Sequence, residues 1–215
     1  MGKLKIEADN TLLCLEKAMA DRNFLRLYEG AVQKAVEITK AEAERLETEC
    51  VREIISGISS RIKTPESVQR KLLKKGWEVN LETAVLRLND IAGIRAACYF
   101  LDDVYELAAR LKTNEEIHFL KEKNYIEKPK DSGYKSLHLI VEVPVETENG
   151  EQWMKVEIQL RTLAMDFWAR LDHRLCYKKE LKAAKAIQKD LREYAKIISR
   201  VDIQMLTLRK RIDAL

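Results

Sequence analysis

Two carboxylates in the middle of the chain could hold a divalent cation. Asp90 comes just before a short β-rich run, and Glu157 lies on a second run with period-two alternation. Mg²⁺ in phosphoryl-transfer enzymes is typically held by one or two carboxylates together with the phosphates of the substrate. Spacing alone leaves open whether the two side chains converge on one site or are unrelated surface acids. If they converge, they predict metal-assisted phosphoryl transfer.

Cations that could bind a polyphosphate lie on segments that flank these carboxylates in the sequence. They are Arg61, Lys63 and Lys71 around a helix start, Arg95 on a strand, and Lys128, Lys130 and Lys135 in a loop. Arginine pairs with phosphate through two parallel hydrogen bonds, whereas lysine acts as a point charge. Any one cluster is ordinary surface charge, but the grouping around both carboxylates is what an anionic nucleotide site needs.

A loop at residues 129–138 carries an aromatic side chain next to a glycine. Tyr134 follows Gly133 and could stack on a nucleobase, with Lys130 or Lys135 at the phosphates. The alternative is that Tyr134 anchors the loop into the core, which is the commoner fate of a single tyrosine. The residues leave both alternatives open.

Period-two alternation indicates the strands that would position these side chains. Residues 136–143 and 154–161 each place apolar side chains on one face, and Glu148-Asn149-Gly150 between them is a hairpin turn signal. The opposite faces are polar: Ser136, His138 and Glu142 on the first strand, and Lys155, Glu157, Gln159 and Arg161 on the second. Antiparallel sheets commonly have one wet face, so a solvated face is the alternative to a site.

Helical spacing dominates the rest of the chain. The further predicted elements are two or three helices within residues 10–58, a helix from Thr64 to Lys75, a strand at 94–100, a helix at 104–111, and helices at 163–177 and 182–215. This order of helices, small mixed sheet and helices predicts an α+β fold, and no linker divides the single domain of residues 1–215. The last helix is amphipathic, which suits a subunit interface and packing on its own domain equally well.

Composition narrows the function classes without choosing among them. The 215 residues carry a net charge of +4, which is too mild to indicate DNA or membrane binding by itself. RNA binding is compatible with this charge but not indicated by it. The four cysteines are scattered, which predicts reduced and mostly buried thiols. No segment has the apolar length of a signal peptide or a membrane span, so we expect a cytoplasmic protein without a membrane partner.

Four ordered motifs span about residues 55–178. They are Arg61-Ile-Lys-Thr-Pro-Glu-Ser67, Asn89-Asp-Ile-Ala-Gly-Ile-Arg95, Asp131-Ser-Gly-Tyr-Lys-Ser-Leu-His138, and Val156-Glu-Ile-Gln-Leu-Arg-Thr162 running into Ala164-Met-Asp-Phe-Trp168. Together they resemble the synthetase domain of the RelA/SpoT proteins, especially the compact RelQ-type small alarmone synthetases, and they are far more specific than a lone signature. The resemblance implies a nucleotidyltransferase-like fold with its core at about 55–178 and helical extensions at about 10–54 and 182–215.

The same resemblance implies a Mg²⁺-dependent enzyme that moves the β,γ-pyrophosphate of ATP onto the 3′-hydroxyl of GDP or GTP, making ppGpp or pppGpp. Asp90 would hold magnesium, and Glu157 would share the metal or act as general base on the 3′-hydroxyl. The ATP-binding residues would be Arg61 and Arg95 around adenine, and Lys63, Ser67 and Lys71 at the phosphates. The acceptor-binding residues would be Tyr134 on guanine, Lys130 and Lys135 at the phosphates, and His138 and Gln159 lining the site. Lys135 stands where relatives often have arginine, which leaves the acceptor preference open.

RelQ-type relatives further imply a homotetramer with a central allosteric site for (p)ppGpp, to which no residue is carried over. Hydrolase activity is not expected, because none of the histidines His118, His138 and His173 is followed by aspartate. Two alternatives stay open: a relative that uses tRNA or an adenine nucleotide as acceptor, and a non-catalytic nucleotide-binding or RNA-binding module. A helical scaffold would leave the four motifs unexplained.

Overall fold

A mixed β-sheet lies at the centre of the molecule, and the computed structural model describes residues 2–176 and 185–215. Within these ranges, five strands pair in the order β1 (Ile55–Ile62), β2 (Ala92–Cys98), β5 (Gly150–Thr162), β4 (Leu137–Thr147) and β3 (His118–Asn124). β2 and β5 are parallel, and the other neighbours are antiparallel. The predicted α+β class with a small mixed sheet is confirmed.

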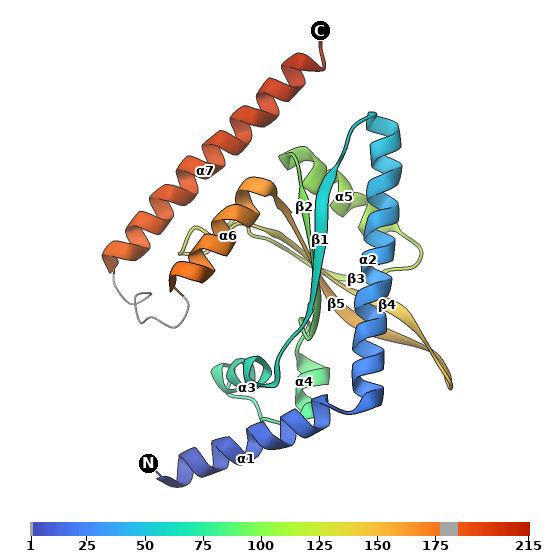
Figure 1. Cartoon of the computed structure of the whole chain (residues 1–215), viewed down its shortest axis with the longest axis vertical. Helices are drawn as coiled ribbons and strands as arrows, with labels where there is room; N and C mark the ends of the chain where they lie inside the picture. Colours follow the sequence, from blue (N-terminus) through green and yellow to red (C-terminus); the bar gives the residue numbers. More distant parts are fainter. Residues whose placement is uncertain (1, 177–184) are drawn as a thin grey trace.

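Helices cover the sheet from two sides (Figure 1). The helices within the described residues are α1 (Gly2–Met19), α2 (Arg22–Cys50), α3 (Pro65–Lys74), α4 (Leu81–Arg87), α5 (Leu101–Thr113), α6 (Leu163–Cys176) and α7 (Lys185–Ile212). α2 packs across β1, β2, β4 and β5 and, together with α5, closes the main core. α6 contacts β5 and β2 on the other side of the sheet, with α7 packed against it (Figure 1).

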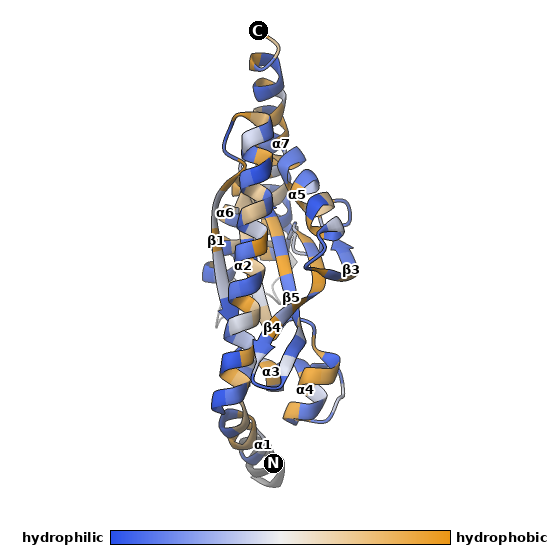
Figure 2. Ribbon diagram, turned by 90° about the vertical axis from the view of Figure 1, so that its right-hand side faces the viewer, coloured by the Kyte–Doolittle hydropathy of each residue, from blue (hydrophilic) through white to orange (hydrophobic). Residues whose placement is uncertain are grey.

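β5 shows how the two faces of the sheet differ, since apolar and polar residues alternate along it (Figure 2). Val156, Ile158 and Leu160 are fully buried in the core under α2, and each such side chain stabilises the fold by about 1.5–3 kcal/mol. Successive side chains point to opposite faces, so Glu157 and Gln159 point away from that core. Both are nevertheless buried. The alternative of a solvated polar face is therefore wrong for this strand.

Three elements differ from the sequence prediction: β1, β3 and α4. The segment up to residue 58 was predicted as helical, but α2 ends at Cys50 and β1 follows it. Ile55, Ile58 and Ile62 are three and four residues apart, which is the spacing of one face of a helix and explains the wrong prediction. In the structure they belong to an edge strand of the sheet. β3 is the other edge strand and is mostly exposed, so it shows no alternation. α4 has only seven residues, too few for a helical period to be visible.

Other sequence predictions are confirmed, with one correction. Thr64 caps α3 as predicted, and β4 and β5 form the predicted hairpin. The cysteines are not mostly buried, because Cys14 and Cys50 lie exposed on helices and only Cys98 is buried among the thiols described. Burial raises the pKa of the Cys98 thiol, which therefore stays protonated. The predicted helical positions 177 and 182–184 lie outside the described residues, and within the described residues no helix is long and apolar enough to cross a membrane.

Replacement of Val51 by glycine is expected to stabilise the protein. Val51 follows α2 in the left-handed conformation, with a φ of 54°, which costs a residue with a β-carbon about 1–2 kcal/mol but is free for glycine. Its side chain is 90% exposed, so little packing is lost. We expect Val51→Gly to raise the free energy of unfolding in urea by about 1 kcal/mol. Val85→Gly, inside α4, should lower it, and a loss in both variants would contradict strain at Val51.

Candidate active site

Two rows of side chains cross the polar face of the sheet, because paired residues on neighbouring strands point to the same side. The first row contains Arg61, Gly93 and Glu157, and the second contains Ser59, Arg95, Gln159, His138 and Lys123. Gly93 has no side chain, which leaves space between Arg61 and Glu157. Strand register therefore brings together polar residues from all five strands.

The two rows form the floor of a cleft of about 870 Å³, within the size range of small-molecule sites. Other walls come from α3, the loop around Lys130, and α6. The lining residues are Arg61, Lys71, Asp90, Arg95, Lys123, Tyr125, Lys130, Tyr134, His138, Glu157, Gln159, Arg161, Ala169, Arg170, Asp172, His173 and Arg174. Cations outnumber carboxylates in this set, so the cleft suits a strongly anionic ligand.

Asp90 is the carboxylate best placed to take a metal ion. Its Oδ2 accepts hydrogen bonds from Lys63 Nζ (2.8 Å) and Lys71 Nζ (2.6 Å), whereas its Oδ1 is buried and has no hydrogen-bond partner among the described residues. Burial by itself raises the pKa of the Asp90 carboxyl, but the hydrogen bonds and charges of the two lysines lower it by more. The pKa of Asp90 therefore lies below its ordinary value. A buried charged oxygen without a partner is costly. Mg²⁺ would satisfy this oxygen, so the residues present fit the ion.

Glu157 is held on both oxygens. Its Oε1 lies 3.1 Å from His138 Nδ1, and its Oε2 accepts a hydrogen bond from Gln159 Nε2 (2.7 Å). Burial raises the pKa of the Glu157 carboxyl, but the contacts with His138 and Gln159 lower it below its ordinary value. Burial also lowers the pKa of His138, which favours a neutral ring that donates from Nδ1 to Glu157. The site thus contains an ionised carboxylate in a fixed orientation.

Tyr134 links the loop to this carboxylate. Its hydroxyl accepts a hydrogen bond from Arg161 Nη2 (2.6 Å) and lies 2.9 Å from His138 Nε2, which as the unprotonated nitrogen accepts from it. Lys130 Nζ lies 4.5 Å from the centre of the Tyr134 ring and 4.7 Å from that of Tyr125, within the range of cation–π attraction. Tyr134 is half-buried and lines the cleft, so the alternative of a core anchor is wrong.

Several residues of the cleft were not predicted as site residues. Arg161 could have been found, since it shares the polar face of β5 with Glu157. Asp166 lies in the last motif and does not itself line the cleft, but its carboxylate accepts hydrogen bonds from two lining residues, Arg161 Nη1 (3.2 Å) and Arg170 Nε (2.5 Å). Lys123 and the lining residues of α6 had no signal in the sequence, because β3 was not predicted and nothing indicated that α6 lies beside the cleft.

Three predicted site residues do not line the cleft. Lys63 is linked to the cleft through its ion pair with Asp90, which does line it. Ser67 lies at the start of α3, where its backbone N–H donates to Thr64 Oγ1 (3.4 Å). Lys135 lines a different, very small cavity, together with residues of α6 and α7 that include Asp202. The structure therefore does not place Lys135 with Lys130.

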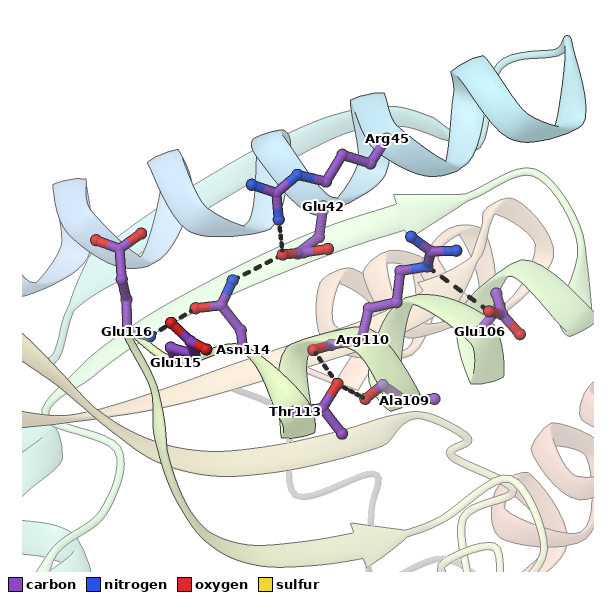
Figure 3. Close-up of a pocket in the computed structure, with 9 residues that line it drawn as sticks. All are labelled: Glu42, Arg45, Glu106, Ala109, Arg110, Thr113, Asn114, Glu115 and Glu116. Carbon is purple, nitrogen blue, oxygen red and sulfur yellow. Dashed lines mark hydrogen bonds and ion pairs between the residues drawn. The ribbon is translucent and has the colours of Figure 1, made fainter.

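A second cleft of about 640 Å³ lies between α2 and α5 (Figure 3). Its acidic side chains are largely paired within the cleft: Glu42 Oε1 accepts hydrogen bonds from Arg45 Nη1 (2.5 Å) and Asn114 Nδ2 (2.7 Å), and Glu106 Oε1 lies 3.7 Å from Arg110 Nε. Such internal pairing neutralises charge rather than offering it to a ligand. The cleft over Glu157 is therefore the candidate active site.

Comparisons with known proteins identify the family of the chain. The family model described as a region found in RelA/SpoT proteins matches residues 60–182. GTP pyrophosphokinase YwaC of Bacillus subtilis strain 168 is 42% identical over 159 residues, which are 74% of this chain and 76% of that protein. GTP pyrophosphokinase YjbM of the same organism is 33% identical over 190 residues, 88% of each protein.

A solved structure shows the same fold. The crystal structure of small alarmone synthetase 1 from Bacillus subtilis bound to its product pppGpp has a TM-score of 0.79 and 32% identity, covering 90% of this chain and 97% of that one. The family model covers more than half of this chain and includes the segments that carry Arg61, Asp90, Tyr134 and Glu157. The chain therefore belongs to the RelA/SpoT family.

Proposed function

We propose that this protein is a Mg²⁺-dependent (p)ppGpp synthetase, which transfers the β,γ-pyrophosphate of ATP to the 3′-hydroxyl of GDP or GTP. The observation that carries this proposal is the placement of Asp90 and Glu157 in one cleft that is rich in cations. Two relatives are named GTP pyrophosphokinases, and a similar solved structure is bound to pppGpp. These similarities support the same reaction here.

The donor nucleotide would lie on the side of the cleft formed by β1 and α3. Arg61 pairs with Gly93, so Arg61 and Arg95 are diagonal neighbours on one face, about 7–8 Å apart at this kind of position. From Cα atoms at that spacing, two arginine side chains can reach both faces of adenine. Lys63 and Lys71, which already surround Asp90, would contact the phosphates, with Ser67 at the N-terminus of α3 beside them.

The acceptor nucleotide would lie on the opposite side, beside the loop. Tyr134 would stack on guanine, and Lys130 would contact the acceptor phosphates, since both line the cleft. His138 and Gln159 would fix the ribose side, because they also orient Glu157. Lys135 has no place in this arrangement, because it faces α7.

Glu157 suits the role of general base. Both of its oxygens are held by hydrogen bonds, and the lowered pKa keeps its carboxyl ionised at neutral pH. It would take the proton of the 3′-hydroxyl as the bond from the 3′-oxygen to the β-phosphorus forms and the bond from that phosphorus to the AMP oxygen breaks. Mg²⁺, held by Asp90 and the substrate phosphates, would neutralise charge on the transferred group.

We further propose a homotetramer that acts in the cytoplasm and responds to (p)ppGpp. Support comes from large apolar side chains that are exposed on α6 and α7, among them Phe167, Leu175, Tyr194, Ile197 and Val201. Apolar surface of this kind commonly marks association between subunits. No residue is assigned to the allosteric site.

Transfer of label from ATP to a guanine nucleotide tests the proposed function. Purified protein is incubated with ATP labelled in the β,γ-pyrophosphate, Mg²⁺, and GDP, GTP, GMP, AMP or tRNA in parallel, and its mass is measured by light scattering. We expect label transfer to GDP or GTP that is abolished by EDTA. We expect the measured mass to be that of a tetramer. Transfer to AMP or tRNA alone would instead identify a relative with a different acceptor. Absence of transfer to any of these acceptors would contradict the proposed transferase activity. A measured mass equal to that of a monomer would contradict the proposed homotetramer.

A further inference from the structure

The long helix α7 contacts the acceptor loop at Gly133. This glycine has a φ of +89°, and a Cβ built on it would lie 2.6 Å from the Cβ of Ala195 on α7. Only a residue without a side chain fits both the conformation and the contact. The loop backbone therefore lies directly against α7, one residue before Tyr134.

A second connection runs through a buried carboxylate of α7. Asp202 is 7% exposed, and its Oδ2 accepts a hydrogen bond from Thr162 Oγ1 (2.7 Å). The same hydroxyl oxygen accepts a hydrogen bond from the backbone N–H of Met165 (3.1 Å), in the first turn of α6. Thr162 is itself fully buried at the end of β5. One hydroxyl thus joins β5, α6 and α7.

The first turn of α6 is coupled to the cleft through Asp166. Asp166 Oδ1 accepts a hydrogen bond from Arg161 Nη1 (3.2 Å), and Arg161 Nη2 donates to the Tyr134 hydroxyl (2.6 Å). A shift of the α6 start would therefore move the cation that holds Tyr134. Both connections from α7 end on Tyr134: one through the loop backbone, the other through Thr162, Asp166 and Arg161.

We propose that Asp202 is a positioning residue for the acceptor nucleotide, which acts from α7 through Thr162 to hold Tyr134 and Lys130 in place. The acceptor part of this inference rests on the proposed function. Asp202 does not line the catalytic cleft; it lines the small cavity where Lys135 also lies. Lys135 therefore contributes to the junction between loop and α7, rather than to the phosphate site.

Kinetics of three matched variants test this role. Asp202→Ala is expected to raise the KM for GDP or GTP about tenfold, because small displacements of positioning groups have effects of this order or larger, and to leave the KM for ATP nearly unchanged. Asp202→Asn should keep an acceptor KM close to that of the unaltered protein, since its amide oxygen can still accept from Thr162. Asp190→Ala, at an exposed site on the same helix, is the control and should change neither constant.

Hydrogen–deuterium exchange tests positioning without reference to the reaction. Backbone amides at residues 128–136 should exchange faster in Asp202→Ala, but not in Asp190→Ala. If Asp202→Ala does not fold, Thr162→Val removes the other partner of the same hydrogen bond while keeping the side-chain shape, and should give the same two results. Unaltered protein that transfers nothing to guanine nucleotides would overturn the proposed function, and the exchange data alone would then decide the positioning role. Two results in an active protein would overturn the positioning role. One is that the changes affect neither the acceptor KM nor the exchange rates, and the other is that they lower only the fraction of folded protein.

Discussion

Glu157→Gln is expected to lower kcat for pyrophosphate transfer by about 1,000-fold, within the range that general acid–base groups contribute. The carboxylate is buried, ionised and fixed between His138 and Gln159. The substituted amide keeps the size of the side chain but cannot take the proton of the 3′-hydroxyl. Single-turnover transfer of labelled pyrophosphate measures the chemical step, and calorimetry measures the affinity for each nucleotide separately.

The control for this change lies on the same strand. Glu151→Gln, at the exposed start of β5, removes the same charge far from the cleft and should leave kcat unaltered. If Glu157→Gln retained most of its kcat, another group would have to be the base, and Glu157 would only orient its neighbours. If instead nucleotide affinity fell while single-turnover chemistry persisted, Glu157 would belong to binding rather than to catalysis.

Much of the cleft could be predicted because its floor depends on strand alternation. The sequence places Glu157 and Gln159 on one polar face and His138 on the polar face of the hairpin partner, and the register pairs His138 with Gln159. The turn signal at Glu148-Asn149-Gly150 was enough to predict the hairpin, but not its register. The prediction of a metal-binding Asp90 is supported by its buried Oδ1, which has no hydrogen-bond partner among the described residues.

The rest depends on contacts between distant segments, which alternation does not indicate. β1 carries Arg61, yet its isoleucines have helical spacing, so Arg61 was identified by its motif while its strand was missed. Lys135 has the same charge as Lys130 and is near it in sequence, but packing of Gly133 against α7 directs the two lysines to different sides. A helix that is amphipathic in sequence does not reveal which loop it will contact.

Asp90→Asn is expected to lower kcat/KM for ATP by about 100- to 1,000-fold, a loss comparable to removal of a main electrostatic group from an active site. One Asp90 oxygen pairs with Lys63 and Lys71, and the other is buried with no hydrogen-bond partner in the part of the chain that the structure describes. Asparagine has nearly the same shape but cannot neutralise two lysines or bind Mg²⁺ strongly. Activity should therefore require more Mg²⁺, and titration of the initial rate with Mg²⁺ at saturating GDP measures this shift.

The Mg²⁺ titration separates a metal ligand from a residue that only holds lysines. If Asp90 binds the ion, Asp90→Asn shifts the Mg²⁺ dependence, while Lys71→Met lowers ATP affinity and leaves that dependence nearly unaltered. If Asp90 only fixes Lys63 and Lys71, both changes should weaken ATP binding to the same extent, and the half-saturating Mg²⁺ concentration should stay constant. Asp190→Asn serves as the charge-matched control on an exposed helix position. A constant Mg²⁺ requirement in Asp90→Asn would remove Asp90 from the metal site, and Glu157 would then be the remaining predicted metal ligand.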